Sequence, residues 1–175
     1  MIADLTLPCD AGPGERSLLL LRRAVLDDLP SLVRLLSDDP ISAGRGDVAA
    51  DEDEAAYEAA FRSIAQDPGN DLVVAVDGAG AVVGTLQLTV IPGMARRGSS
   101  RLLVEAVRVA SAERSAGIGT ALMRWVLDVA AIELRTPLVQ LTSDAARTDA
   151  HRFYLRLGFV DSHVGFKRRV ELPGS

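Results

Sequence analysis

The sequence predicts a single domain of the mixed α/β class, and three observations support this. The chain has 175 residues, the length of one ordinary domain. Hydrophobic residues make up 48% of it and charged residues 25%, the balance of a globular protein with a buried core. Strand-like apolar runs alternate with segments whose apolar residues recur at helical spacing, in the order β-α-α-β-β-β-α-β-α-β and without internal repeats.

The first half of the chain is predicted to begin with a tail that lies outside the domain. Residues 1–16 contain two Pro, two Gly and scattered polar residues, which predicts a mobile segment and a domain spanning 17–175. The next elements are a strand, two helices and two strands, at residues 17–24, 29–36, 51–66, 72–76 and 82–90. Asp27 and Asp28 can cap the first helix. The sequence Asp77-Gly78-Ala79-Gly80 is typical of a hairpin turn, so the two strands around it are expected to be antiparallel neighbours.

The second half is predicted to alternate strands and helices. The elements fall at residues 102–109, 117–134, 138–141, 150–157 and 164–170. The strand at 102–109 is apolar on both faces apart from two charges, which is typical of a central strand. The helix at 117–134 has the strongest apolar stripe of the chain, formed by Ile118, Leu122, Trp125, Val129 and Ile132.

Charge and cysteine content exclude several classes of function. The net charge is −5, which argues against a nucleic-acid binder held by phosphate contacts. With one Cys and two His, neither an internal disulfide nor a Cys/His zinc site is expected, and no metal is predicted. No apolar run has the length of a signal core or membrane span, so the sequence predicts no membrane partner and a cytoplasmic protein.

The most informative segment is the loop that joins the strand at 102–109 to the helix at 117–134. It reads Arg114-Ser115-Ala116-Gly117-Ile118-Gly119-Thr120. Such a loop directs backbone N–H groups and a helix N-terminus at one point, and its glycines let an anion approach without Cβ collisions. The segment therefore predicts a phosphate-binding loop. It lacks the third glycine of the dinucleotide fingerprint and the Gly-Lys of the P-loop, which excludes both.

Arg-x-x-Gly-x-Gly after a strand is similar to the pyrophosphate loop of the GCN5-related N-acetyltransferase (GNAT) superfamily. The resemblance covers residues 17–170 and includes Val109, five residues before Arg114, and the ending Tyr154-Leu155-Arg156-Leu157-Gly158-Phe159. It implies a central mixed, mostly antiparallel sheet flanked by helices on both faces. One departure is Arg147, which stands where family members often carry Asn, so an Asn-mediated contact with CoA is not expected here.

The resemblance further implies that acetyl-CoA is the cosubstrate. Its pyrophosphate is expected on the amides of the glycine loop, and its pantetheine arm along the backbone of the preceding strand. The expected binding residues are Val107, Val109, Arg114, Ser115, Ala116, Gly117, Ile118, Gly119 and Thr120. The N–H of Val109 is expected to polarise the thioester carbonyl.

Glu105 is the predicted catalytic base. It shares strand parity with Leu103, Val107 and Val109, and burial within such an apolar row would make the carboxylate a better base. It also matches a position where related enzymes commonly keep an acid that acts through water. The alternatives are an interior carboxylate paired with Arg101 or Arg108, and a solvated residue beside a bulge.

Tyr154 is the predicted general acid. It lies in the apolar stripe of the last helix, which by itself indicates a core tyrosine. The resemblance instead implies that its hydroxyl lies beside the sulfur of CoA and protonates the leaving thiolate. His151, one turn earlier, could relay a proton, although an exposed helical histidine is the simpler interpretation.

These features together predict an acetyl-CoA-dependent N-acetyltransferase that acts on a primary amine of a small molecule. The alternatives are a non-catalytic acyl-CoA-binding sensor module and a protein or peptide N-acetyltransferase. A homodimer is compatible with the family, though no segment demands one. Acidic residues could attract a cationic amine or could simply complement a helix dipole; they are Asp47, Asp51, Glu52, Asp53, Glu54 and Glu58.

Overall fold

The computed structural model describes residues 2–12, 18–39, 44 and 49–171, and it divides into two compact units, Met1–Gln140 and Leu141–Ser175. The short 3-10 helices are η1 (Ile2–Asp4), η2 (Leu26–Asp28), η3 (Asp51–Asp53) and η4 (Ser111–Glu113). The strands are β1 (Cys9–Asp10), β2 (Leu19–Arg23), β3 (Asn70–Asp77), β4 (Val82–Ile91), β5 (Arg101–Val109) and β6 (Val139–Leu141). The remaining helices are α1 (Leu29–Ser37), α3 (Glu54–Gln66), α4 (Ala95–Gly98), α5 (Ile118–Trp125), the π-helical turn η5 (Val126–Ala130), α6 (Ala131–Glu133) and α7 (Thr148–Arg156).

The strands form one six-stranded sheet in the order β1-β2-β3-β4-β5-β6. Each neighbouring pair from β1 to β5 is antiparallel. The N–H of Leu102 in β5 donates to the main-chain oxygen of Leu138, directly before β6, at 2.9 Å. The β3–β4 turn is closed by Asp77, whose carboxylate accepts the N–H groups of Ala79 and Ala81. The predicted hairpin and the mixed α/β class are thus confirmed.

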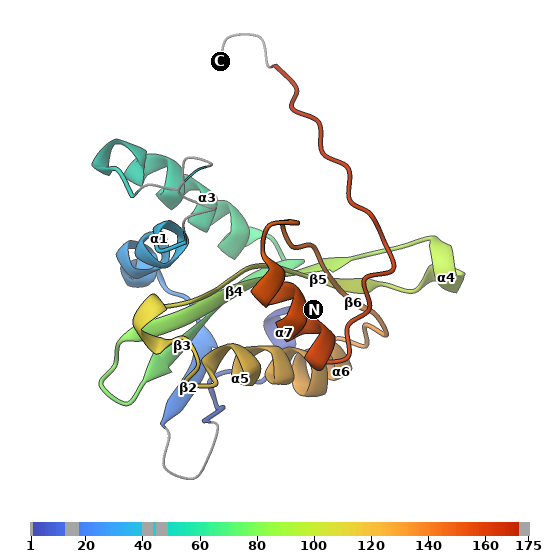
Figure 1. The fold of residues 1–175 in the computed structure, drawn as a ribbon, viewed down its shortest axis with the longest axis horizontal. Coiled ribbons are helices and arrows are strands. Elements are labelled where there is room, and N and C mark those ends of the chain that lie inside the picture. Colours follow the sequence, from blue (N-terminus) through green and yellow to red (C-terminus); the bar gives the residue numbers. More distant parts are fainter. Residues whose placement is uncertain (1, 13–17, 40–43, 45–48, 172–175) are drawn as a thin grey trace. The chain divides into compact units, whose positions relative to one another are not determined.

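Helices cover both faces of the sheet (Figure 1). On one face, α1 and α3 bury Leu29, Leu32 and Phe61 against Val74 and Val76 of β3. The opposite face is covered by α5. Gly84 pairs with Ala75, which is adjacent to Val74 and therefore points to the opposite face of the sheet, away from α1. A Cβ on Gly84 would lie 3.2 Å from both Ile118 and Leu122 of α5.

The long helix follows its predicted stripe only as far as Trp125. Ile118, Leu122 and Trp125 are buried, but Ile132 is 68% exposed. The π-helical turn η5 follows Trp125 and adds a residue to the turn, which rotates the buried face onto Ala130 and Ala131. The predicted burial of Ile132 is therefore wrong.

The N-terminal residues belong to the packed structure rather than to a tail outside it. Ile2 and Leu5 are each 3% exposed, and Cys9 pairs with Leu21 of β2. The guanidinium of Arg23 donates to the main-chain oxygens of Ile2, Ala3 and Leu5. The prediction of a tail outside the domain is thus wrong for residues 2–10.

The predicted last strand, residues 164–170, is wrong as well. After α7 the described chain, up to residue 171, forms neither helix nor strand. Its apolar side chains are exposed, including Val164, Phe166 and Val170. An alternating apolar pattern fits a strand, but a strand also needs a hydrogen-bonded neighbour, and this segment has none within the described residues.

Candidate functional site

A β-bulge in the middle of β5 shapes the candidate site. Gln87 of β4 pairs with Glu105 and Thr85 pairs with Arg108, so Ala106 and Val107 together oppose a single residue of β4. Ala106 has a φ of 50°, which is left-handed backbone.

The bulge changes which face the β5 side chains share. Glu105 pairs with Gln87, which in turn pairs with Leu72, so Glu105 lies on the face that α1 and α3 cover. Val109 pairs with Gly84 and faces α5. The predicted shared face of Glu105 and Val109 is therefore wrong, because the extra residue reverses the alternation between them.

The N–H of Val109 points away from β4. The N–H of Ala110 donates to Val83 at 2.9 Å, and neighbouring strand residues direct their N–H groups to opposite sides. The other side of β5 is bordered by β6 only near Leu102. A three-residue strand spans about 10 Å, whereas Val109 lies roughly 23 Å along β5 from Leu102. β6 therefore ends before it reaches Val109, whose N–H forms no part of the β4–β5 ladder.

The loop after β5 presents backbone donors at the start of α5. Ser115 and Gly117 have φ values of 76° and 86°, and the first intrahelical bond runs from the N–H of Ala121 to the oxygen of Gly117. The three amides between them, at residues 118–120, consequently have no acceptor within the helix. Together with the positive end of the helix dipole, these donors fit an anionic group such as a phosphate.

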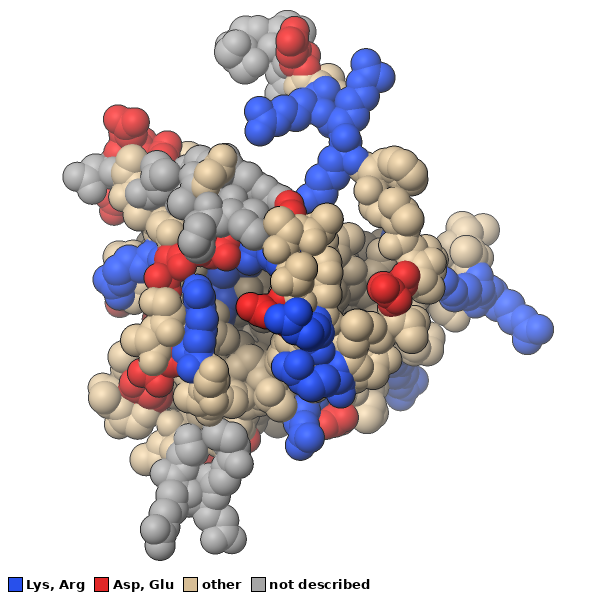
Figure 2. Space-filling model, viewed as in Figure 1, with Lys and Arg blue, Asp and Glu red and all other residues tan. Residues whose placement is uncertain are grey.

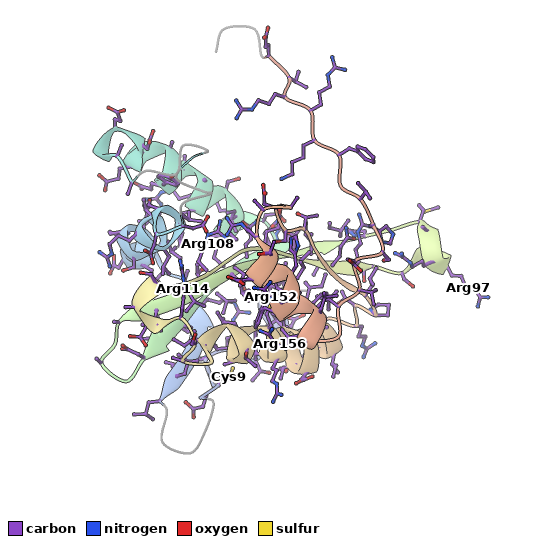
Figure 3. The ribbon with its side chains drawn as sticks, viewed as in Figure 1. Cys9, Arg97, Arg108, Arg114, Arg152 and Arg156 are labelled. Atoms are coloured by element: carbon purple, nitrogen blue, oxygen red, sulfur yellow. The ribbon has the colours of Figure 1, made fainter. Side chains whose placement is uncertain are left out.

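The side chain of Arg114 is engaged at the end of α1 (Figure 3). Its guanidinium Nη2 donates to the main-chain oxygen of Asp38 at 3.2 Å. The N–H of Ser111 donates to Oδ2 of Asp38 at 2.6 Å. Hydrogen bonds from Ser111, with a smaller contribution from the charge of Arg114, lower the pKa of Asp38. Sequence reasoning missed Asp38, since residues 73 positions apart share no local pattern.

Glu105 is exposed, so its predicted burial is wrong and the alternative of a solvated residue beside a bulge describes it. A polar cluster missed by sequence reasoning shares its face: Oδ1 of Asn70 accepts hydrogen bonds from Nε2 of Gln87 at 3.3 Å and from Oγ1 of Thr89 at 2.5 Å. Gln87 is directly opposite Glu105. The sequence shows Thr85, Gln87 and Thr89 alternating with apolar residues, which indicates a polar side of this strand but not its partner Asn70 on the neighbouring strand.

In the second unit, Tyr154 is half-buried on α7. Its ring lies 5.2 Å from that of Phe153 and 5.8 Å from that of Phe159. His151 is half-buried, with Nε2 2.8 Å from the main-chain oxygen of Asp144, so the simpler interpretation of an exposed histidine is wrong. Arg147 occupies the N-cap position of α7.

Among the described residues, acidic side chains lie at the N-terminal end of α3 (Figure 2). Glu52 and Glu54 are exposed there, while Asp47 falls outside the described residues. Arg62, one turn further along α3, pairs with Glu58 at 2.5 Å.

Among the described residues no group of three or more His, Cys, Asp or Glu is arranged to hold a metal ion. Over the same residues, none of the helices combines the length and apolar character that crossing a membrane requires.

A mixed sheet whose bulged strand leads through a glycine loop into a helix defines this molecule as an α/β protein with a strand–loop–helix site. Comparison with known families then identifies it: residues 29–159 match the model of the acetyltransferase (GNAT) family, and the chain belongs to that family. None of the curated proteins compared with the sequence matches it.

Solved structures agree with this family. The chain is 39% identical to a transcriptional regulator from Bacillus halodurans C-125, with a TM-score of 0.82 over 87% of this chain and 99% of that one. It is 28% identical to a putative acetyltransferase from Agrobacterium tumefaciens str. C58, with a TM-score of 0.73 over 86% and 99%. A glucosamine-6-phosphate N-acetyltransferase from Arabidopsis thaliana, 15% identical over 87% and 99%, shares the fold with a TM-score of 0.70.

Proposed function

We propose that the protein is an N-acetyltransferase that moves the acetyl group of acetyl-CoA to a primary amine, with a small molecule as the acceptor. The observation that carries this proposal is that two groups of backbone donors follow each other along the chain: the N–H of Val109, which points away from β4, and the amides at the start of α5. An extended arm and a phosphate group, joined in one molecule, match those two features. Membership of the acetyltransferase family supports the same cosubstrate.

Each predicted binding residue except Arg114, whose guanidinium contacts Asp38, has a direct role in this proposal. The amides of Ile118, Gly119 and Thr120 receive the pyrophosphate, and Gly117 supplies the left-handed turn that aims them. Ser115 and Ala116 form the turn before it. Val107 and Val109 line the pantetheine arm, and the N–H of Val109 donates to the thioester carbonyl as negative charge develops on its oxygen.

The amine is proposed to approach over the sheet face that carries Glu105. Nε2 of Gln87 donates a hydrogen bond to Asn70, so the amide oxygen of Gln87 does not face Asn70. That oxygen and the exposed carboxylate of Glu105 belong to paired residues, so neighbouring strands offer two acceptors on the same face of the sheet. Such a pair suits an ammonium group, and Glu105 would then accept the proton that the amine must lose, through water.

Tyr154 is proposed to protonate the departing thiolate. A phenol can donate a proton to sulfur once the acyl bond breaks, and its role is confined to that step. The rings of Phe153 and Phe159 pack beside it and limit its movement.

A second candidate function is a non-catalytic acyl-CoA-binding sensor. It is favoured by the 39% identity with a structure described as a transcriptional regulator. Both candidates predict binding of acetyl-CoA, but only the enzyme releases CoA.

The test is a screen of primary amines with acetyl-CoA, in which the free thiol of CoA is measured over time. The proposal predicts amine-dependent thiol release for at least one small amine. Tight binding of acetyl-CoA without thiol release, across small amines and lysine-containing peptides, would favour the sensor. Release with peptides alone would show a protein acetyltransferase instead.

A further inference from the structure

We propose that Asp38 is a positioning residue that holds the loop between β5 and α5 in the shape that binds the pyrophosphate. The inference rests on the proposed function and adds a residue to it from a different part of the chain. Asp38 makes two contacts with that loop: its Oδ2 accepts the N–H of Ser111 at 2.6 Å, and its main-chain oxygen accepts Nη2 of Arg114 at 3.2 Å. We call these three residues the Asp38 clamp.

The two contacts fix both ends of η4. Ser111 is the first residue of this turn, and within it the N–H of Glu113 donates to Ala110 and that of Arg114 donates to Ser111. The N–H of Ser111 instead donates to the side-chain carboxylate of Asp38. The clamp therefore supplies the turn with a cap from another element.

The backbone directly after the clamp explains why such support matters. Ser115 follows Arg114 and has a φ of 76°, a conformation that residues with a Cβ rarely adopt. A strained residue of this kind persists only when its surroundings hold it in place. Since Ser115 lies two residues before Gly117, its conformation determines where the amides at the start of α5 point.

The position of Asp38 on α1 argues against a role in helix stability. Asp38 is the C-cap residue of α1, and a carboxylate at that end is unfavourable with respect to the helix dipole. Removal of its charge should therefore leave the stability of α1 unchanged or raise it. A negative charge is also a poor direct ligand for pyrophosphate, so the hydrogen bond that the carboxylate accepts from Ser111, together with the nearby positive charge of Arg114, is the remaining explanation for an acid at this position.

The test measures the dissociation constant of acetyl-CoA by calorimetry for the full chain and three variants. Asp38→Ala removes the acceptor and should weaken binding about 10-fold. Asp38→Asn retains an oxygen at the same place and should stay within about 3-fold of the parent. Asp27→Ala removes an exposed acid from η2, before α1, and should bind like the parent. Because Asp38→Ala also loses the stabilising hydrogen bond from Ser111, its melting temperature should fall modestly, and every dissociation constant is measured well below the melting temperature of that variant.

Several outcomes would overturn the inference. Parental affinity in Asp38→Ala would show that the loop keeps its shape without the clamp, and tighter binding in both Asp38 variants would show that the carboxylate only repels the ligand. Hydrogen exchange of the unliganded proteins gives a second readout, since the Ser111 amide should exchange faster in Asp38→Ala; unchanged exchange contradicts the clamp. A parent that binds no acetyl-CoA would overturn the proposed function itself, and this inference with it.

Discussion

Gly84 allows α5 to approach the sheet, and Gly84→Ala tests that arrangement. A Cβ at this position would lie 3.2 Å from three atoms: the main-chain oxygen of Arg108, Cγ2 of Ile118 and Cδ1 of Leu122. The oxygen belongs to the sheet and the two carbons to α5, so the simplest relief is a small outward shift of the helix. Overpacking of this kind costs about 1–3 kcal/mol, and each kcal/mol lowers Tm by roughly 2–4 °C in a chain of this size.

The expected result for Gly84→Ala is a Tm about 2–12 °C below the parent by circular dichroism, together with weaker binding of acetyl-CoA, because α5 carries the proposed pyrophosphate amides. Gly165→Ala is the matched control, since a Cβ there meets no atom within 4 Å. A Tm for Gly84→Ala equal to or above that of the parent would refute the described packing of α5 on β4.

Three further variants test single residues. Tyr154→Phe retains the ring and removes the proton donor, so kcat should fall on the order of 100-fold while the Kd of acetyl-CoA barely changes; unchanged kcat would end the general-acid role. Glu105→Gln should lower turnover about 10-fold near neutral pH and less at high pH, where the amine is already neutral, and a pH profile that superimposes on the parent's would contradict the base role. Hydrogen bonds from Arg22 lower the pKa of buried Asp28 in the folded protein. The ionised carboxylate therefore stabilises the fold fully at pH values above the pKa of Asp in the unfolded chain, about 3.9, and this stabilisation is lost as the pH falls through the lower pKa of the folded protein. Asp28→Asn should therefore destabilise the protein by about 2 kcal/mol at pH 7, and urea midpoints should converge with those of the parent in strong acid; a gap that widens there would be inconsistent with this pair.

Local patterns predicted most elements of the fold. The hairpin around Asp77-Gly78 and the helices α1, α3 and α7 each depend on residues close together in sequence, and all four are present. The shift of the stripe after Trp125 was not predictable, because a π-helical turn depends on packing rather than on spacing. The N-terminal segment was missed for a similar reason. Its Pro and Gly content is typical of a tail, but tertiary contacts hold it, such as the one between Thr6 and Glu133, 127 positions away.

In the candidate site, too, features that depend on neighbouring residues were predictable and features that depend on contacts between separate elements were not. The glycine loop was predictable, since its glycines and the following helix are contiguous in sequence. The bulge at Ala106 was not, because an extra residue in β5 shows only in its register with β4. It altered the environment expected for Glu105. The Asp38 clamp and the cluster around Asn70 join separate elements, so no single segment of sequence could indicate them.

The central claim is that the amides at the start of α5 bind the pyrophosphate of acetyl-CoA, and calorimetry of Gly119→Glu tests it most directly. The new carboxylate would occupy the anion position while remaining favourable at a helix N-terminus, so the fold should persist. Gly165→Glu introduces the same charge in open space and serves as the control. The account predicts micromolar-range binding for the parent and for Gly165→Glu, and none for a folded Gly119→Glu. Parental affinity in Gly119→Glu would contradict it.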